Sequence, residues 1–206
     1  MSVAGRIFAA CIAAAAWVGL TVQFADTYYR TGSAVISLWV IFAYFTITTN
    51  LLVGVVFSCI AIDRNRLRAD WIVAGTVLSI VLVGAVYALL LRGALEMSGG
   101  SALVDRLLHD VTPVCAPLLW IFFVRKGRLT WRDPLLWAIY PLAYLVYGIA
   151  RGLATGKYAY PFLNVATLGW SCTALNAFSI AVAFMVCGYA LVLIDRRMGS
   201  RAIAAS

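Results

Sequence analysis

Long apolar runs that carry almost no charge constrain this chain more than any other feature of its sequence. A transmembrane helix needs about 20 consecutive, predominantly apolar residues, because it has to cross the hydrocarbon core of a bilayer. Runs of roughly this length occur six times along the chain, at Gly5–Phe24, Ser37–Ile62, Trp71–Leu91, Val104–Val124, Pro134–Ala150 and Thr173–Ile194. The sequence therefore predicts an all-α fold, a polytopic membrane bundle of six transmembrane helices.

Very little of the chain lies outside these runs. Charged residues make up 12% of the 206 residues, whereas they make up about 25% of a typical soluble domain. We therefore expect one transmembrane domain over residues 1–198 and a short cytoplasmic tail over residues 199–206. Arg6 and the run Ala13–Ala16 resemble parts of a signal peptide, but no cleavage signal follows before Phe24, so we expect a retained first span.

The basic residues are distributed unevenly between the two sides of the predicted bundle. Eleven of the 16 Lys and Arg residues lie at the start of the first run or follow the second, fourth and sixth runs, namely Arg6, Arg64, Arg66, Arg68, Arg125, Lys126, Arg128, Arg132, Arg196, Arg197 and Arg201. Because cytoplasmic loops carry an excess of Lys and Arg, both termini are predicted to be cytoplasmic. The net charge of +8 then reflects orientation and contact with membrane lipids. It does not indicate a nucleic-acid partner, because the basic groups lie in short loops with no folded face.

The cysteine and lysine positions argue against metal and cofactor chemistry. The five cysteines lie within or beside the apolar runs, and they form neither a CxxC pair nor a metal-ligand spacing with the single histidine. A retinal protein needs a lysine inside the membrane, and both lysines, Lys126 and Lys157, fall in predicted loops. We therefore expect no metal and no cofactor.

The single histidine, His109, lies near the start of the fourth apolar run. An ionisable side chain inside a bilayer is costly and is by default a candidate functional group. The second run contains the polar cluster Thr46-Ile47-Thr48-Thr49-Asn50. Along straight helices that rise about 1.5 Å per residue, Thr46 lies about 13 Å and His109 about 8 Å below the outer surface, so the two can meet.

A hydroxyl beside an imidazole supplies the parts for base-assisted nucleophilic attack. One face of the second helix should carry the polar side chains, because residues three and four apart are neighbours; it consists of Thr46, Thr49, Asn50 and Val53. A structural role remains open, because threonine in a membrane helix commonly bonds the carbonyl four residues back and asparagine commonly bonds across helices. Asp110 points about 100° away from His109 on a helix, so it is a weak candidate to orient the imidazole.

Three stretches of the chain resemble a known family. They are Tyr44-Phe45-Thr46-Ile47, His109, and Gly156–Leu163 with its Tyr-Pro-Phe-Leu ending. They resemble the androgen-induced and androgen-dependent hydrolases, and most closely the bacterial six-span relatives of that family. The resemblance implies a membrane enzyme that cleaves fatty acid esters of hydroxy fatty acids, with Thr46 as nucleophile and His109 as its histidine. Arg106 stands where the family has an earlier histidine, and Pro113 is displaced by one position.

We therefore expect an integral membrane hydrolase of lipid (fatty acyl) esters in a bacterial cytoplasmic (inner) membrane, acting on a lipid ester within the bilayer. Candidates to bind the substrate or stabilise an oxyanion are Asn50, Thr49, Tyr158, Tyr160 and Asn164. The Asn50 amide is the first choice of donor, because it lies one turn from Thr46. The alternative is a non-catalytic six-span scaffold, a lipid-binding protein or a transport protein.

Overall fold

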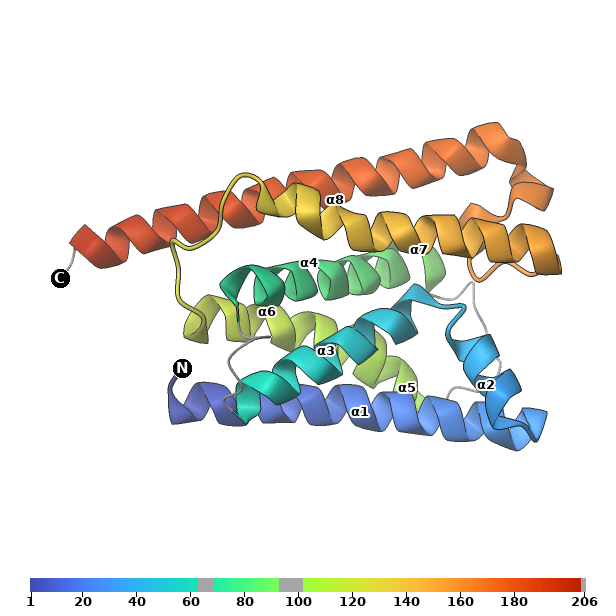
Figure 1. Ribbon diagram of the computed structural model, residues 1–206, viewed down its shortest axis with the longest axis horizontal. Coiled ribbons are helices and arrows are strands. Elements are labelled where there is room, and N and C mark those ends of the chain that lie inside the picture. The colour runs from blue at the N-terminus through green and yellow to red at the C-terminus, as the bar shows by residue number, and fades with distance from the viewer. Residues whose placement is uncertain (63–68, 93–101, 205–206) are drawn as a thin grey trace. The chain divides into compact units, whose positions relative to one another are not determined.

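The computed structural model describes residues 1–62, 69–92 and 102–204, and within these ranges it contains helices and no strands. The chain divides into two compact units, Met1–Arg128 and Leu129–Ser206, and each is described by itself (Figure 1). Whether residues 1–198 behave as one domain stays a prediction. Four of the basic residues that support the predicted orientation are not described. Arg64, Arg66 and Arg68 lie outside the described ranges, and the side chain of Arg201 is not described.

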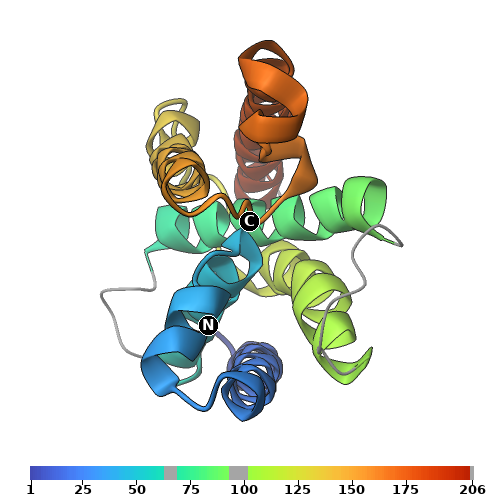
Figure 2. The same cartoon turned by 90° about the vertical axis from the view of Figure 1, so that its right-hand side faces the viewer.

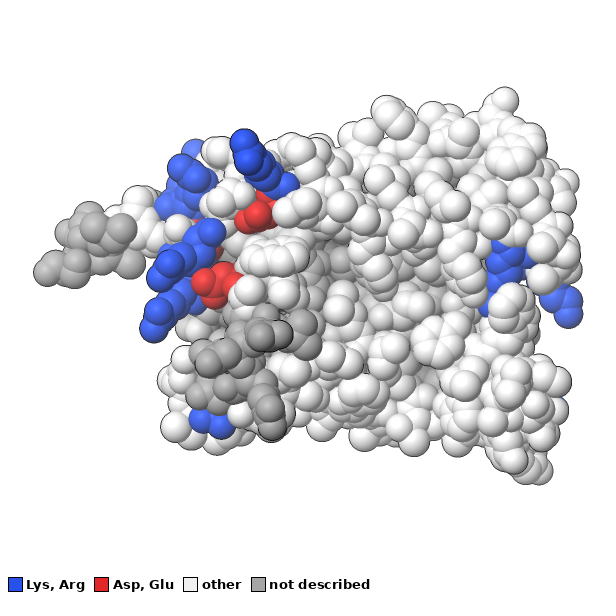
Figure 3. Space-filling view, viewed as in Figure 1, with Lys and Arg blue, Asp and Glu red and all other residues white. Residues whose placement is uncertain are grey.

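The described helices fit a multi-pass integral membrane protein. Five are long and apolar enough to cross a membrane: Val3–Thr31, Asp70–Leu91, Ala102–Phe123, Asp133–Thr155 and Val165–Ser200. A bent pair, Ala34–Ile41 and Phe45–Ala61, makes a sixth if it is counted as one span. On the face shown in Figure 3, charged side chains gather near the helix ends and the surface between them is uncharged. The all-α prediction is confirmed, and the cytoplasmic location of the termini stays a prediction.

The second predicted span, Ser37–Ile62, is not one straight helix. It consists of α2 (Ala34–Ile41) and α3 (Phe45–Ala61), which meet at an angle of 98°. The depth calculated for Thr46 along a straight helix is therefore wrong, because Thr46 lies in the first turn of α3, directly after the bend. The stretch contains neither glycine nor proline at the bend, so the local sequence does not predict the bend.

Burial of apolar side chains on both sides of the bend accounts for it. Ile41 at the end of α2 and Ile47 at the start of α3 both enter one buried cluster, which also contains Val104 and Leu108 from the fourth span. On a straight helix, residues six apart point about 120° away from each other, since each residue turns about 100°. The bend lets both side chains pack into the same apolar core, where van der Waals contacts hold the spans together.

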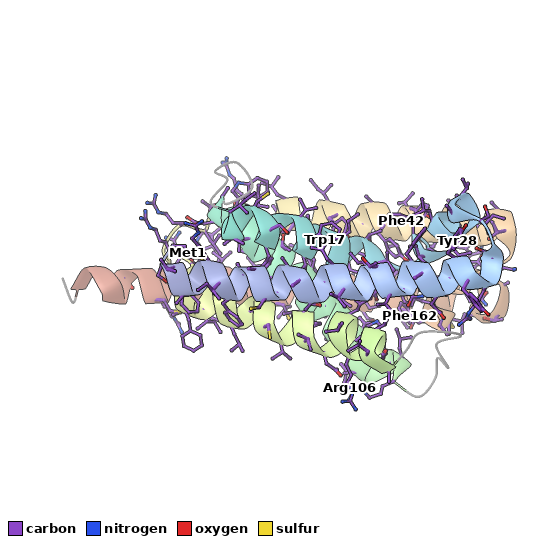
Figure 4. The ribbon with its side chains drawn as sticks, turned by 90° about the horizontal axis from the view of Figure 1, so that it is seen from below. Met1, Trp17, Tyr28, Phe42, Arg106 and Phe162 are labelled. Atoms are coloured by element: carbon purple, nitrogen blue, oxygen red, sulfur yellow. The ribbon has the colours of Figure 1, made fainter. Side chains whose placement is uncertain are left out.

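Helix α1 (Val3–Thr31) packs against α3 through small residues and one tryptophan. The buried residues of α1 are mostly glycine and alanine, which allow two helices to approach closely. Trp17 fills the space beside Gly54, where a Cβ atom would lie 2.9 Å from the indole, and its Nε1 donates to Ser58 Oγ at 3.1 Å. Figure 4 shows Trp17 on the α3 side of α1.

Helix α4 (Asp70–Val86) crosses the same unit obliquely and contacts both α3 and α6 (Thr112–Phe123) (Figures 1 and 2). The contact with α6 centres on Gly84, where a Cβ atom would lie 2.7 Å from Pro113 Cβ. That distance is shorter than carbon atoms tolerate, and a proline ring cannot rotate away. Gly84 therefore sets how closely these two helices approach.

The fourth span, Ala102–Phe123, contains a π-helical turn where the sequence places His109. It runs as α5 (Ala102–Arg106), the π-turn η3 (Leu107–Val111) and α6. Pro113 lacks the N–H that would bond the His109 carbonyl, and its ring crowds that carbonyl. The helix widens instead, so that the Thr112 N–H bonds the carbonyl of Leu107, five residues back.

The second unit contains α7 (Asp133–Thr155), the short η4 (Pro161–Leu163) and α8 (Val165–Ala204). Both helices extend beyond the predicted runs Pro134–Ala150 and Thr173–Ile194, so the connection before the last span is shorter than expected. Gly169, with φ of 72°, interrupts α8 near its start and separates its first turn from the rest of the helix. Asp195 in α8 is 1% exposed and accepts a hydrogen bond from the Leu129 N–H at 2.9 Å. This bond joins the segment before α7 to α8.

The Gly84 contact yields a prediction for stability. We expect Gly84→Leu to lower the melting temperature in detergent, because overpacking against the Pro113 ring typically costs about 1–3 kcal/mol. The matched control is Gly148→Leu in α7, where a Cβ atom would meet only Tyr144 atoms at 3.7 Å or beyond. Equal melting temperatures for the two variants would show that α4 and α6 do not approach this closely.

Candidate active site

Thr46 and His109 are in hydrogen-bonding contact, 63 residues apart in the chain. Thr46 Oγ1 lies 3.2 Å from His109 Nε2. Both side chains are buried, with exposed fractions of 8% and 6%. The first turn of α3 supplies the hydroxyl, and the π-turn η3 supplies the imidazole. The bend before α3 and the π-turn in the fourth span thus bring the two residues together.

Asp105 occupies the other nitrogen of the imidazole. Its Oδ1 lies 3.0 Å from His109 Nδ1, one helical turn earlier on the same span. A carboxylate only accepts hydrogen bonds, so Nδ1 carries the hydrogen and Nε2 presents its lone pair to the Thr46 hydroxyl. The hydroxyl, the imidazole and the carboxylate therefore form one continuous hydrogen-bonded line.

Tyr87 holds both the carboxylate and the imidazole. Its hydroxyl donates to Asp105 Oδ2 at 2.5 Å, and its ring stacks on the His109 ring with centroids 4.1 Å apart and planes 15° apart. Tyr87 begins a second π-turn, η2 (Tyr87–Leu91), in which the Arg92 N–H bonds the Tyr87 carbonyl at 2.8 Å. The third span thereby fixes the plane of the imidazole ring and the position of its carboxylate partner.

Asn50 joins α3 to the carbonyl that the π-turn releases. Because the Thr112 N–H bonds Leu107, the Leu108 carbonyl loses its usual helical donor. Asn50 Nδ2 donates to this carbonyl at 3.2 Å and to the Thr46 carbonyl at 3.0 Å. Asn50 Oδ1 accepts from Thr112 Oγ1 at 2.7 Å. All of the amide's hydrogens are therefore used in holding the two spans together, so we do not assign Asn50 to an oxyanion.

The start of α3 gives the Thr46 hydroxyl a favourable electrostatic position. The positive end of a helix dipole stabilises negative charge within the first turn. Thr46 is the second residue of a helix of 17 residues, so charge that develops beside its Oγ1 lies at this positive end. Among the residues that the structure describes, no group of three or more His, Cys, Asp or Glu side chains could hold a metal ion.

The remaining predicted residues of the first unit take other positions. Thr49 is fully buried on the expected face of α3. Asp110 turns away from the imidazole, as expected, and accepts from Arg92 Nη2 at 2.8 Å. Arg106 is exposed and points away from the neighbouring helices (Figure 4), so it does not take the place of a second histidine in this site.

Tyr158, Tyr160 and Asn164 belong to the second unit and have structural contacts there. Tyr158 packs on Gly152, Tyr160 stacks on Phe162 with ring centroids 5.1 Å apart, and Asn164 Oδ1 accepts the Ala166 and Thr167 N–H groups at the start of α8. These contacts shape the turn between α7 and α8. The roles in substrate binding expected for these three residues stay predictions.

Sequence reasoning missed Asp105, Tyr87 and Thr112. Asp105 carried a usable signal, because it lies four residues before His109 and side chains at that spacing are neighbours on a helix. Tyr87 and Thr112 carried none, since an apolar run commonly contains a tyrosine or a threonine. Their roles depend on two π-turns that the sequence does not mark as such.

Comparisons of this chain with protein-family models, with curated proteins and with solved structures found no match. The resemblance carried by Thr46, His109 and the Tyr-Pro-Phe-Leu stretch therefore stays an expectation. The chemistry of the site has to be argued from its geometry.

The Asn50 connection can be tested by removing one hydroxyl. We expect Thr112→Val to lower the free energy of unfolding by about 1–3 kcal/mol, because it leaves the buried Asn50 Oδ1 without this donor. Thr112→Ser keeps the donor and should melt close to the wild type. Thermal unfolding in detergent measures both. If serine and valine are tolerated equally, the hydroxyl does not stabilise the joined spans.

Proposed function

We propose that this protein is an integral membrane hydrolase of lipid esters that uses Thr46 as nucleophile and His109 as general base. The observation that carries the proposal is the line from Thr46 Oγ1 to His109 Nε2 at 3.2 Å and from His109 Nδ1 to Asp105 Oδ1 at 3.0 Å. A threonine hydroxyl is a weak nucleophile until a base takes its proton. A carboxylate on the opposite ring nitrogen orients the base and stabilises the imidazolium that forms.

The first half of the reaction forms an acyl-enzyme. His109 Nε2 takes the Thr46 proton while Oγ1 attacks the ester carbonyl carbon, and the carbonyl oxygen becomes an oxyanion. The positive end of α3 stabilises this charge. When the intermediate collapses, the bond from carbon to the alcohol oxygen breaks. The alcohol leaves with the proton from His109 Nε2, and the acyl group remains on Thr46.

In the second half, water takes the place of the alcohol and the carboxylic acid is released from Thr46. His109 Nε2 takes a proton from water, the resulting hydroxide attacks the acyl carbon, and the carboxylic acid departs as Thr46 Oγ1 recovers its proton. Tyr87 keeps the imidazole plane fixed in both halves, because stacking and the bond to Asp105 act on the same pair. No cofactor enters either step.

A lipid ester suits the surroundings of this site. Thr46 and His109 lie inside a unit whose long helices are apolar enough to cross a membrane. An acyl chain gains about 0.8 kcal/mol for each methylene that moves from water into apolar surroundings, so a lipid ester concentrates in a membrane. A bacterial inner membrane, with both termini on the cytoplasmic side, remains the location that we propose from the distribution of basic residues.

The first test removes the Thr46 hydroxyl and keeps the shape of the side chain. We expect Thr46→Val to abolish labelling by a fluorophosphonate probe and to reduce turnover of lipid esters at least about 10³-fold, because no nucleophile remains. The matched control is Thr48→Val on the same helix, where the hydroxyl donates to the Phe45 carbonyl at 3.1 Å and not to the imidazole. Thr48→Val should keep both signals.

The outcomes separate the hydrolase from its alternative. Loss of labelling and turnover in Thr46→Val and in His109→Gln, with both variants still folded at the assay temperature, supports the hydrolase. Well-folded wild type that neither labels nor turns over a panel of linear and branched lipid esters would leave a non-catalytic scaffold, lipid-binding or transport protein. In that case the buried line of hydrogen bonds only satisfies the polar atoms of His109.

Two aspartates near His109 make a second test of the same mechanism. We expect Asp105→Asn to lower kcat by about 10²–10⁴-fold, because the amide no longer holds the hydrogen on Nδ1 and the Nε2 lone pair is lost. Asp110→Asn changes an aspartate whose partner is the half-exposed Arg92, and it should retain most of the activity. Steady-state kinetics of both variants measure the difference. Equal losses would contradict the assigned orientation of the imidazole.

A further inference from the structure

The first unit contains a pocket of about 570 Å³ at the end of its helices where α1 begins. Its walls come from the starts of α1 and α4 and from the ends of α3 and α6. Figure 4 marks this end of α1 by Met1. The volume lies within the range of about 300–1,000 Å³ that is usual for small-molecule sites. Thr46 lies in the first turn of α3 and the pocket residue Ile60 in its last, so the pocket is separate from the candidate active site.

Two side chains of opposite charge line this pocket. Arg125 contributes a guanidinium and Asp70 a carboxylate, and the ion pairs of the described residues include neither of them. Two nearby cations have backbone partners: Lys126 Nζ donates to the Trp120 and Val124 carbonyls, and Arg6 Nε donates to the Ala61 carbonyl at 3.0 Å. Among the described residues, the lining therefore offers a ligand the Arg125 guanidinium and the Asp70 carboxylate, beside the terminal ammonium of Met1.

The other walls combine a hydroxyl with apolar surface. Ser2 Oγ accepts the Gly5 N–H at 3.2 Å, which leaves the hydroxyl hydrogen of Ser2 to donate to a ligand. Ile60, Val73 and Phe123 supply apolar surface from three different helices. A ligand that fits has an acceptor-rich anion, a cationic donor and an apolar part, and it lies at the level where spanning helices end.

We propose that this pocket binds the headgroup of a phospholipid that carries both a phosphate and a primary ammonium, as phosphatidylethanolamine does. Arg125 and the Ser2 hydroxyl bind the phosphate, because a guanidinium presents a fork of donors to phosphate oxygens. Asp70 accepts from the ammonium. Ile60, Val73 and Phe123 contact the glycerol and the first methylenes of the acyl chains.

The charge pattern distinguishes this ligand from other phospholipids. A phosphatidylglycerol headgroup has no cation, so Asp70 would lack the ammonium partner that ethanolamine supplies. A phosphatidylcholine headgroup has a cation but no N–H group, so it cannot donate a hydrogen bond to Asp70. The preferred order is therefore ethanolamine first, with choline and glycerol headgroups weaker.

The test measures lipid retention by the full-length protein in detergent micelles. The protein is mixed with phospholipids that share the same acyl chains and carry ethanolamine, choline or glycerol headgroups, and native mass spectrometry counts the lipid retained. We expect wild type to retain the ethanolamine lipid best. Asp70→Asn should reduce its preference over the glycerol lipid by about fivefold, which corresponds to about 1 kcal/mol. Arg125→Gln should reduce retention of all three lipids.

Matched controls separate the pocket from general surface charge. Arg128→Gln removes an exposed cation three residues from Arg125 that does not line the pocket, and it should leave retention unchanged. Soluble glycerophosphoethanolamine should compete for the pocket better than inorganic phosphate, which lacks the ammonium. Equal retention of the three lipids by wild type would overturn the proposal. So would an Arg128→Gln loss as large as that of Arg125→Gln, or equal competition by phosphate, while melting temperatures verify that each variant is folded.

Discussion

An imidazole inside a bundle of apolar helices needs a partner for each of its two nitrogens, since an unpaired polar atom in such surroundings is costly. His109 meets this requirement with Thr46 on one nitrogen and Asp105 on the other, and Tyr87 covers the face of its ring. Three spans are thereby held in register around one side chain. The same contacts that satisfy the histidine also orient it toward a hydroxyl, so packing and chemistry place the same demand on this part of the fold.

The apolar runs were enough to predict the helices, because length and hydropathy decide whether a segment crosses a bilayer. They were not enough to predict the bend between α2 and α3, where Ile41 and Ile47 are drawn into a core formed by another span. Such a bend follows from tertiary packing, which a single run of sequence does not contain. The extra turns of α8 beyond Thr173–Ile194 were missed for a related reason, since helical hydrogen bonding continues where hydropathy falls.

The meeting of Thr46 with His109 was predicted from their approximate depths, although the straight-helix calculation behind it was wrong for Thr46. The contact forms nevertheless, because the first turn of α3 packs beside the π-turn that carries His109. The role of Asn50 changed, because its amide hydrogens bond the Thr46 and Leu108 carbonyls. Foreseeing that contact would have required knowing that a π-turn exposes the Leu108 carbonyl. Helix periodicity could have predicted the contact of Asp105 with His109. The contact of Tyr87 depends instead on how a different span packs.

The π-turn beside His109 also affects how chains of this kind can differ in length. A π-turn holds one more residue than the α-helical turn that it replaces, so it absorbs a single-residue insertion without shifting the helix on either side. A related chain with one residue fewer before its proline could keep the same α5, α6 and Asp105–His109 pair by forming an ordinary turn there. Aligning two such sequences would require a gap inside a transmembrane helix, a place where alignments rarely open one. Superposing the flanking helices would therefore align the histidines of two such chains, which a residue-by-residue comparison of the sequences would leave out of register.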